Sequence, residues 1–194
     1  GTSRPYLRIA LLLIPGACTQ AEPERTRRVA SPAAAVQDTA FRGTTVPLHR
    51  PPPPRAAARE TPGELLRAVR VDPQPGFDRV VFEFAGDGLP GYHVEYATAP
   101  VVRCGSGDPV AVAASGRLVV RFEPARAHDQ GPNPTLVPRA MAPGLPAVRD
   151  LQIVCDFEGQ VEMVLGVPAA APYRVVELTA PVRLVLDVRH GAAP

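Results

Sequence analysis

The stretch GFDRVVFEFAGDGLPGYHVEY, residues 76–96, decides the fold class of this chain. In residues 80–84, and again in residues 92–96, every second side chain is large and apolar. A period of two is typical of half-buried β-strands. Residues 86–91 contain three glycines and a proline, which supply the chemistry of a turn. The stretch therefore predicts a strand, a turn and a second strand, paired as a hairpin.

Short segments with the same alternation continue along the chain, and turn residues separate them. No long segment has the 3.6-residue period of an amphipathic helix, although a helix turn is the alternative to a strand for residues 64–71. Many short strands with turns between them are typical of a sandwich, so we expect an all-β domain, an antiparallel β-sandwich of about eight strands, over residues 64–190. Its further strands are predicted at residues 64–71, 110–113, 117–122, 148–155, 160–167, 173–178 and 182–188.

Residues 19–63 have a different composition. They mix proline, including the run Pro51–Pro54, with alanine and arginine, and no apolar period survives. Such a segment buries too little surface to offset its conformational entropy. We expect a disordered Pro/Ala/Arg-rich tether that acts as a spacer, and the alternative for the proline run is a ligand for an aromatic groove.

The net charge of +2 is divided unevenly along the chain. Residues 1–63 carry a net charge of +5 and residues 64–194 a net charge of −3. The sequence contains no lysine, so arginine supplies this positive charge. A nucleic-acid-binding protein is expected to carry its basic patch on the folded part, so we expect no nucleic-acid partner. The basic tether either interacts with anionic lipid or is a plain solvated linker.

Residues 1–18 have the pattern of a secretory signal peptide. Two arginines flank the start, the apolar run Ile9–Ile14 follows, and a pair of small residues precedes Cys18. The run is shorter than the roughly 20 residues of a membrane-spanning helix. The end resembles a bacterial lipobox, whose cysteine is lipidated, although Pro15 departs from the usual pattern. We expect a lipoprotein acylated at Cys18, and an ordinary signal peptide with a chance cysteine is the alternative.

The chain contains three cysteines. Export places them in an oxidising compartment, where cysteines pair. If Cys18 carries lipid, Cys104 and Cys155 remain to form a disulfide, and two free buried thiols are the alternative. Neither the cysteines nor the four histidines have the spacing of a metal site, so we expect no metal and no cofactor.

Residues 124–146 contain six prolines and predict a long loop, which in a compact domain is usually functional or disordered. The loop holds the neighbours His128 and Asp129, whose ordinary interpretation is a pair of solvated residues and not a catalytic pair. No zinc-protease, nucleophile-elbow or phosphate-loop motif occurs, so we expect no enzyme. An envelope protein partner bound through this loop is one alternative function, and an uncharacterised hydrolase is another.

Five motifs along the sandwich segment stand out in combination, namely GFDRVVFEF (76–84), PGYHVEY (90–96), GSGDPV (105–110), DFEG (156–159) and PYRVVELTAPVRLVLDV (172–188). Together they resemble the AMIN-like domain of actinobacterial lipoproteins. The resemblance covers residues 64–190 and implies a β-sandwich. Through the related AMIN domain of cell-wall amidases, it also implies a non-catalytic targeting module that binds peptidoglycan.

The leader and the tether, together with the resemblance, predict an exported module on the outer face of the cytoplasmic membrane, held by a lipid anchor and extending into the cell wall. Its expected ligand is peptidoglycan or another cell-wall polymer. Arginine forks bind carboxylates, such as those of muropeptides, through paired hydrogen bonds, and a plain polar face is the alternative. We predict one binding face, on the outward side of the strands, made by Arg79, Glu83, His93, Glu95, Arg117 and Arg121.

Overall fold

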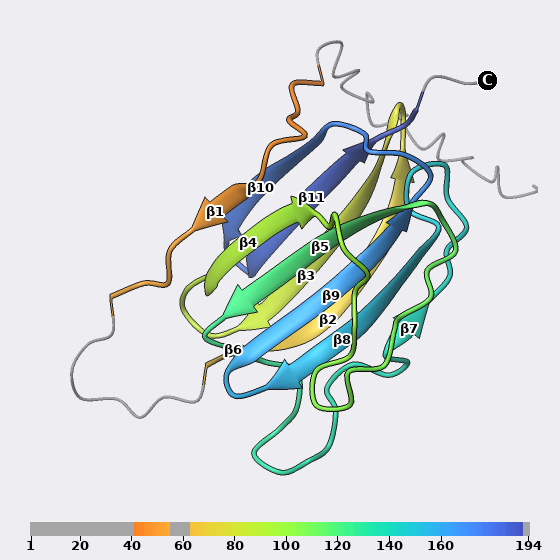
Figure 1. Cartoon of the computed structure of the whole chain (residues 1–194). Helices are drawn as coiled ribbons and strands as arrows, with labels where there is room; N and C mark the ends of the chain where they lie inside the picture. Colours follow the sequence, from red (N-terminus) through yellow and green to blue (C-terminus); the bar gives the residue numbers. More distant parts are fainter. Residues whose placement is uncertain (1–40, 55–62, 192–194) are drawn as a thin grey trace, which may run out of the picture. The chain divides into compact units, whose positions relative to one another are not determined.

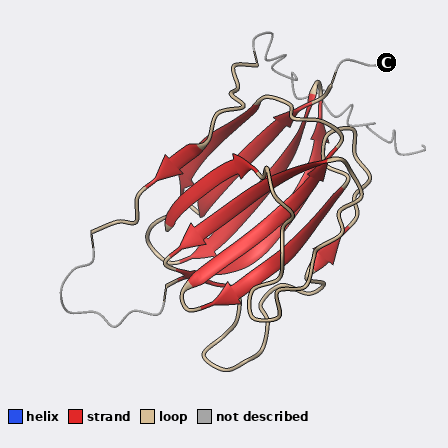
Figure 2. Cartoon of the chain, in the orientation of Figure 1, coloured by secondary structure: helices blue, strands red, loops and turns tan. Residues whose placement is uncertain are grey.

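The computed structural model describes residues 41–54 and 63–191, which form strands and loops (Figures 1 and 2). Eleven strands make two sheets on either side of a hydrophobic core. No helix occurs in these two ranges, and so none there is long and apolar enough to cross a membrane. The predicted all-β class and sandwich architecture are confirmed.

The two sheets contain six and five strands. In the six-stranded sheet the order is β1 (Leu48–Arg50), β4 (Gly91–Tyr96), β5 (Gly116–Glu123), β9 (Gln160–Val167), β8 (Asp150–Phe157) and β7 (Ala140–Met141). In the five-stranded sheet the order is β10 (Tyr173–Thr179), β11 (Val182–Arg189), β3 (Phe77–Ala85), β2 (Glu64–Gln74) and β6 (Ala125–Arg126). All neighbours are antiparallel except β2 and β6, which are parallel.

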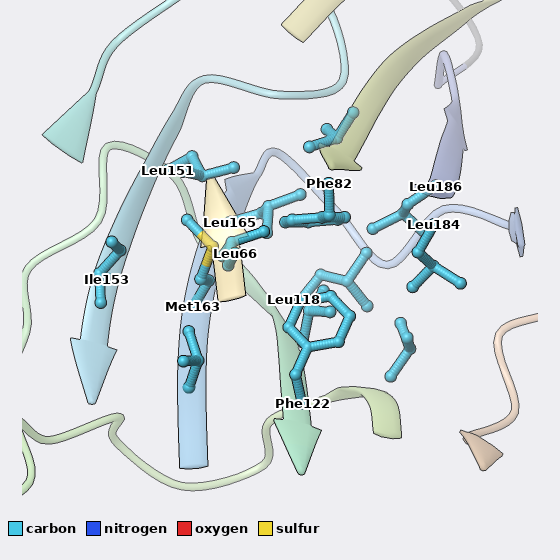
Figure 3. Close-up of a cluster of buried hydrophobic side chains, with 14 of the residues drawn as sticks. Leu66, Phe82, Leu118, Phe122, Leu151, Ile153, Met163, Leu165, Leu184 and Leu186 are labelled. Carbon is cyan, nitrogen blue, oxygen red and sulfur yellow. The ribbon is translucent and has the colours of Figure 1, made fainter. Parts of the chain in front are cut away.

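The core between the sheets contains the side chains that the sequence alternation marks as inward. Val80, Phe82 and Phe84 of β3 are at most 2 % exposed, and the two phenylalanines meet Phe122 of β5 in the opposite sheet. The Phe122 ring packs edge-to-face, 5.1 Å from Phe82 and 5.0 Å from Phe84 between ring centroids. Figure 3 shows Phe82 and Phe122 among leucine side chains from both sheets. Burying each such side chain stabilises the fold by about 1.5–3 kcal/mol, so this layer joins the sheets.

The predicted hairpin of residues 76–96 is wrong in its pairing. β3 lies between β2 and β11, whereas β4 lies between β1 and β5 in the other sheet. The connection buries Leu89 in the core, at 6 % exposure, as the chain crosses from one sheet to the other. Alternation identifies the buried side chains of a strand but not its hydrogen-bonded neighbour, so both arrangements have the same sequence signature.

The predicted connection at residues 156–159 is a true hairpin between β8 and β9. Phe157 pairs with Gln160, which leaves a two-residue loop. Glu158 and Gly159 both have positive φ, at 50° and 78°. A two-residue loop with positive φ at both positions matches the right-handed twist of the strands that it joins.

The prediction of a disordered tether over residues 19–63 is wrong for residues 41–54. Leu48–Arg50 forms β1 and pairs with β4 at the edge of the six-stranded sheet. Thr44 and Tyr173 exchange two backbone hydrogen bonds of 2.8 Å, and Phe41 packs on Phe77 at 5.6 Å. Prolines are tolerated next to an edge strand, and three residues are too few to show a period of two. The proline-rich composition therefore gave no indication of β1. The predicted signal peptide with Cys18, and residues 19–40 and 55–62 of the predicted tether, lie outside the described residues.

Residues 97–115 cover part of the outer face of the six-stranded sheet. The predicted strand at 110–113 is absent, and Val102 and Pro109 form only an isolated bridge. Instead Val101 and Val110 bury against Val164 of β9 in a second, smaller apolar cluster. Cys104 is bonded to Cys155, with 5.1 Å between their Cα atoms, so the predicted disulfide is present and fastens this loop to β8.

Candidate functional site

The structure separates the six residues that were predicted to form one binding face. Two lie on a strand of the five-stranded sheet and four on strands of the six-stranded sheet, so the core separates the two groups. The prediction of a single face is therefore wrong, for the same reason that the hairpin is wrong. The residues are Arg79 and Glu83 on β3, His93 and Glu95 on β4, and Arg117 and Arg121 on β5.

Arg79 is engaged by a carboxylate of its own sheet. Its Nε and Nη2 donate to the two oxygens of Asp187, at 2.7 and 2.9 Å, and Arg174 Nε donates to Asp187 at 2.9 Å. Asp187 is fully buried, and its hydrogen bond to Arg79 raises the pKa of that arginine. Since breaking a buried ion pair is costly, Arg79 serves the fold and is not available to a ligand.

Four of the other five residues of the predicted face lie beside a charged neighbour, and among these His93 lies 3.2 Å from Glu95. Arg117 is the exception, because it has no ion pair within the described residues and its Nε is buried without a hydrogen-bond partner. Glu83 accepts from Arg70 at 2.7 Å and from Arg67, and these arginines lower the pKa of the Glu83 carboxyl. On the opposite face, Arg121 Nε donates to Glu162 at 2.8 Å. Such cross-strand pairs contribute about 0.2–1 kcal/mol each and leave these charges neutralised within the sheet.

One end of the sandwich carries basic residues without such partners. Figure 1 shows that β9 and β11 end, and β8 begins, at this end. A cavity of about 390 Å³ opens there. Arg149 and Arg189 line it, both are exposed, and within the described part of the chain neither contacts a carboxylate. We name this site the end pocket, and its lining residues are Pro146, Ala147, Arg149, Val167, Pro168, Ala169, Ala171, Arg189, His190 and Gly191.

A buried carboxylate behind the end pocket fixes its geometry. Asp78 of β3 is fully buried and accepts hydrogen bonds from the backbone N–H groups of Ala147 and Val148, at 2.6 and 2.9 Å. Its other oxygen lies 2.8 Å from Nε2 of His190. One carboxylate therefore holds both the loop before β8 and the imidazole after β11. The second ring nitrogen of His190 remains for another partner.

We expect Asp78→Asn to lower the free energy of unfolding by about 2 kcal/mol, because the amide keeps the size but loses charge-assisted hydrogen bonds to buried donors. Urea unfolding of the full chain measures this loss. Asp72→Asn on β2 is the matched control, since Asp72 is exposed, and we expect a change below about 0.5 kcal/mol. Equal urea midpoints for Asp78→Asn and Asp72→Asn would contradict the stabilising role of the buried Asp78 carboxylate.

The loop predicted at residues 124–146 packs against the sandwich. Ala125 and Ala127 are buried, and Thr135 Oγ1 donates to the Leu66 carbonyl at 2.6 Å. His128 Nδ1 lies 2.9 Å from Asp156, whereas its neighbour Asp129 accepts from the N–H of Gly131 within a local turn. The two loop residues therefore do not form a pair with each other.

The described residues contain no cluster of three or more side chains that could hold a metal ion. No curated protein and no solved structure matches the chain. The model of one family, the AMIN-like domain, matches residues 64–190, which is most of the chain and nearly all of the sandwich. On that match, this protein belongs to the AMIN-like domain family.

Proposed function

We propose that this protein is a non-catalytic module of the cell envelope that binds peptidoglycan, and that the end pocket is its binding site. The family supports a cell-wall-related binding role outside the cytoplasm. The observation that carries the proposal is the pair Arg149 and Arg189. Both are exposed in one cavity, whereas Arg79 and Arg121 are neutralised by neighbouring carboxylates.

The charge distribution suits a ligand with isolated carboxylates. Residues 64–194 carry a net charge of −3, so the domain as a whole repels polyanions. The end pocket is a local exception, because an arginine fork there can donate two parallel hydrogen bonds to a carboxylate. The carboxylates of muropeptides meet this requirement.

Attachment to the membrane through Cys18 belongs to the same proposal. An acylated Cys18 would hold the protein on the outer face of the cytoplasmic membrane, with the sandwich reaching into the cell wall. Mass spectrometry of the protein extracted from membranes tests this attachment. A mature N-terminus without lipid would reject acylation of Cys18 and favour secretion by an ordinary signal peptide.

The full chain is expected to sediment with purified insoluble cell wall, saturably and in the presence of salt. We expect Arg149→Ala with Arg189→Ala to weaken this binding at least about tenfold, because hydrogen bonds to charged groups contribute about 1.5–3 kcal/mol each. The matched control is Arg103→Ala with Arg183→Ala, which removes the same charge from side chains that donate only to carbonyl oxygens. Equal loss in both variants would mean that net charge, and not the pocket, governs binding.

A second candidate is a protein-interaction module at the 124–146 loop. Val137 is 81 % exposed, and Phe157, at the tip of the β8–β9 hairpin, is 62 % exposed. Deleting the loop would open the core because Ala125 and Ala127 are buried, so Val137→Ser with Phe157→Ser is the sharper test. Loss of a co-purifying envelope protein with retained wall binding would favour this candidate. Turnover of muropeptides by the purified chain would instead favour a hydrolase.

A further inference from the structure

We infer that the end pocket recognises the free carboxylate of a short peptide whose last side chain is small and apolar, as in an alanine-terminated stem peptide. The inference rests on the proposed function and names the part of the cell wall that the pocket takes. It follows from three properties of the pocket, namely its charges, its walls and its rigidity.

The charges of the pocket select an anion. Arg149 and Arg189 contribute two guanidinium groups, of which Arg149 makes only a 3.3 Å contact with the Gly144 carbonyl. His190 adds a ring whose Nε2 is occupied by Asp78, so that Nδ1 is the nitrogen left for a ligand. Arginine forks match the planar, bidentate geometry of a carboxylate. A carboxylate at the mouth of the pocket therefore meets donors from β11 and from the loop before β8.

The walls select a peptide end over a sugar. Apart from its three basic residues, the pocket is lined by alanine, valine, proline and glycine only. None of these lining side chains carries a hydroxyl, an amide or a carboxylate group. The several hydroxyl groups of a pyranose would therefore find few hydrogen-bond partners on these walls, and burying a hydroxyl without a partner costs free energy. Ala147 and Val167 are buried lining residues, so they offer an apolar contact to a small side chain such as a methyl group. The cavity of about 390 Å³ lies at the small end of ligand sites, which span about 300–1,000 Å³.

Both walls are held in place before any ligand arrives. On one side Asp78 fixes the backbone N–H of Ala147. On the other side the Tyr96 hydroxyl donates to the Ala171 carbonyl at 2.7 Å and accepts from the Ala171 N–H at 2.9 Å. A site that is rigid in the free protein loses little entropy on binding, so a small ligand can be bound selectively.

The test measures binding of the full chain to the dipeptide D-alanyl-D-alanine by titration calorimetry or NMR. We expect the acid to bind at least tenfold more tightly than its C-terminal amide, and more tightly than a dipeptide that ends in leucine. Arg149→Ala with Arg189→Ala should abolish this preference, whereas the two lysine substitutions at the same positions should retain part of it, because lysine keeps the charge but loses the fork. Unchanged urea midpoints show that the variants are folded.

Equal affinity for the acid and the amide would overturn the inference, and so would competition by acetate at the same concentration as the dipeptide. The wall assay distinguishes this failure from failure of the proposed function. Wall binding without preference for the acid leaves the module a wall binder and rejects the terminal carboxylate. Preference for the acid without wall binding supports the pocket and rejects the wall.

Discussion

Phe122→Ala lowers the free energy of unfolding by about 4 kcal/mol, the expected effect of removing a fully buried ring that leaves a cavity. Phe122 has no exposed surface, and it contacts Phe82 and Phe84 of the opposite sheet. The neighbouring backbone cannot close the gap, because β5 is paired on both sides, with β4 and β9. Urea unfolding measures the loss, and a fall of roughly 10 °C in the melting temperature should accompany it.

The control for this substitution is Phe157→Ala. It removes the same side chain from a position that is 62 % exposed, so we expect a change within about 0.5 kcal/mol. If Phe122→Ala also cost less than 1 kcal/mol, the two sheets would not be joined through this aromatic contact.

Replacing both Cys104 and Cys155 by alanine lowers the free energy of unfolding by about 4 kcal/mol in the chain-entropy model, because the bond closes a loop with a sequence separation of 51. The loss arises in the unfolded state, which gains conformations, whereas Phe122→Ala acts on contacts of the folded state. A larger dependence of unfolding free energy on urea is therefore expected for the cysteine variant, since its unfolded chain exposes more surface.

A reducing agent added to the unaltered chain should reproduce the effect of the cysteine substitutions. Proteolysis provides a local measurement. Without the bond, the 97–115 loop is held to the sheet by the apolar cluster around Val164 and by a few hydrogen bonds, such as the one from Gln152 Nε2 to the Ala111 carbonyl at 2.7 Å. Cleavage within this loop should therefore precede cleavage elsewhere. An unchanged unfolding midpoint in the variant, or under reduction, would contradict the expected stabilisation.

The sequence predicts the faces of the strands better than their neighbours. Alternation correctly marks Phe82 and Phe122 as inward, because burial on one side of a pleated strand forces a period of two. It says nothing of which sheet a strand joins, and β3 and β4 consequently appeared to be paired. The error of placing the six predicted residues on a single face follows from this ambiguity.

The end pocket was not predicted because its residues are distant in the chain. Arg149 precedes β8 and Arg189 ends β11, and only the packing of the two sheets places them at one cavity. Arg79 was predicted to bind a ligand, but it pairs with Asp187 of the last strand. The register of β3 with β11 pairs these two residues, and no sequence pattern reports that register.

The strand β1 extends the sandwich beyond the N-terminal limit of the family match. The match begins at residue 64, yet Leu48–Arg50 already covers the outer backbone of β4. A chain shortened to residue 64 would leave the N–H and C=O groups of β4 facing solvent as an open edge. Such edges recruit strands from other molecules and lead to aggregation. The three-residue strand β1 therefore becomes the edge of the sheet in place of the longer β4, and a short edge strand offers less backbone to a neighbouring copy.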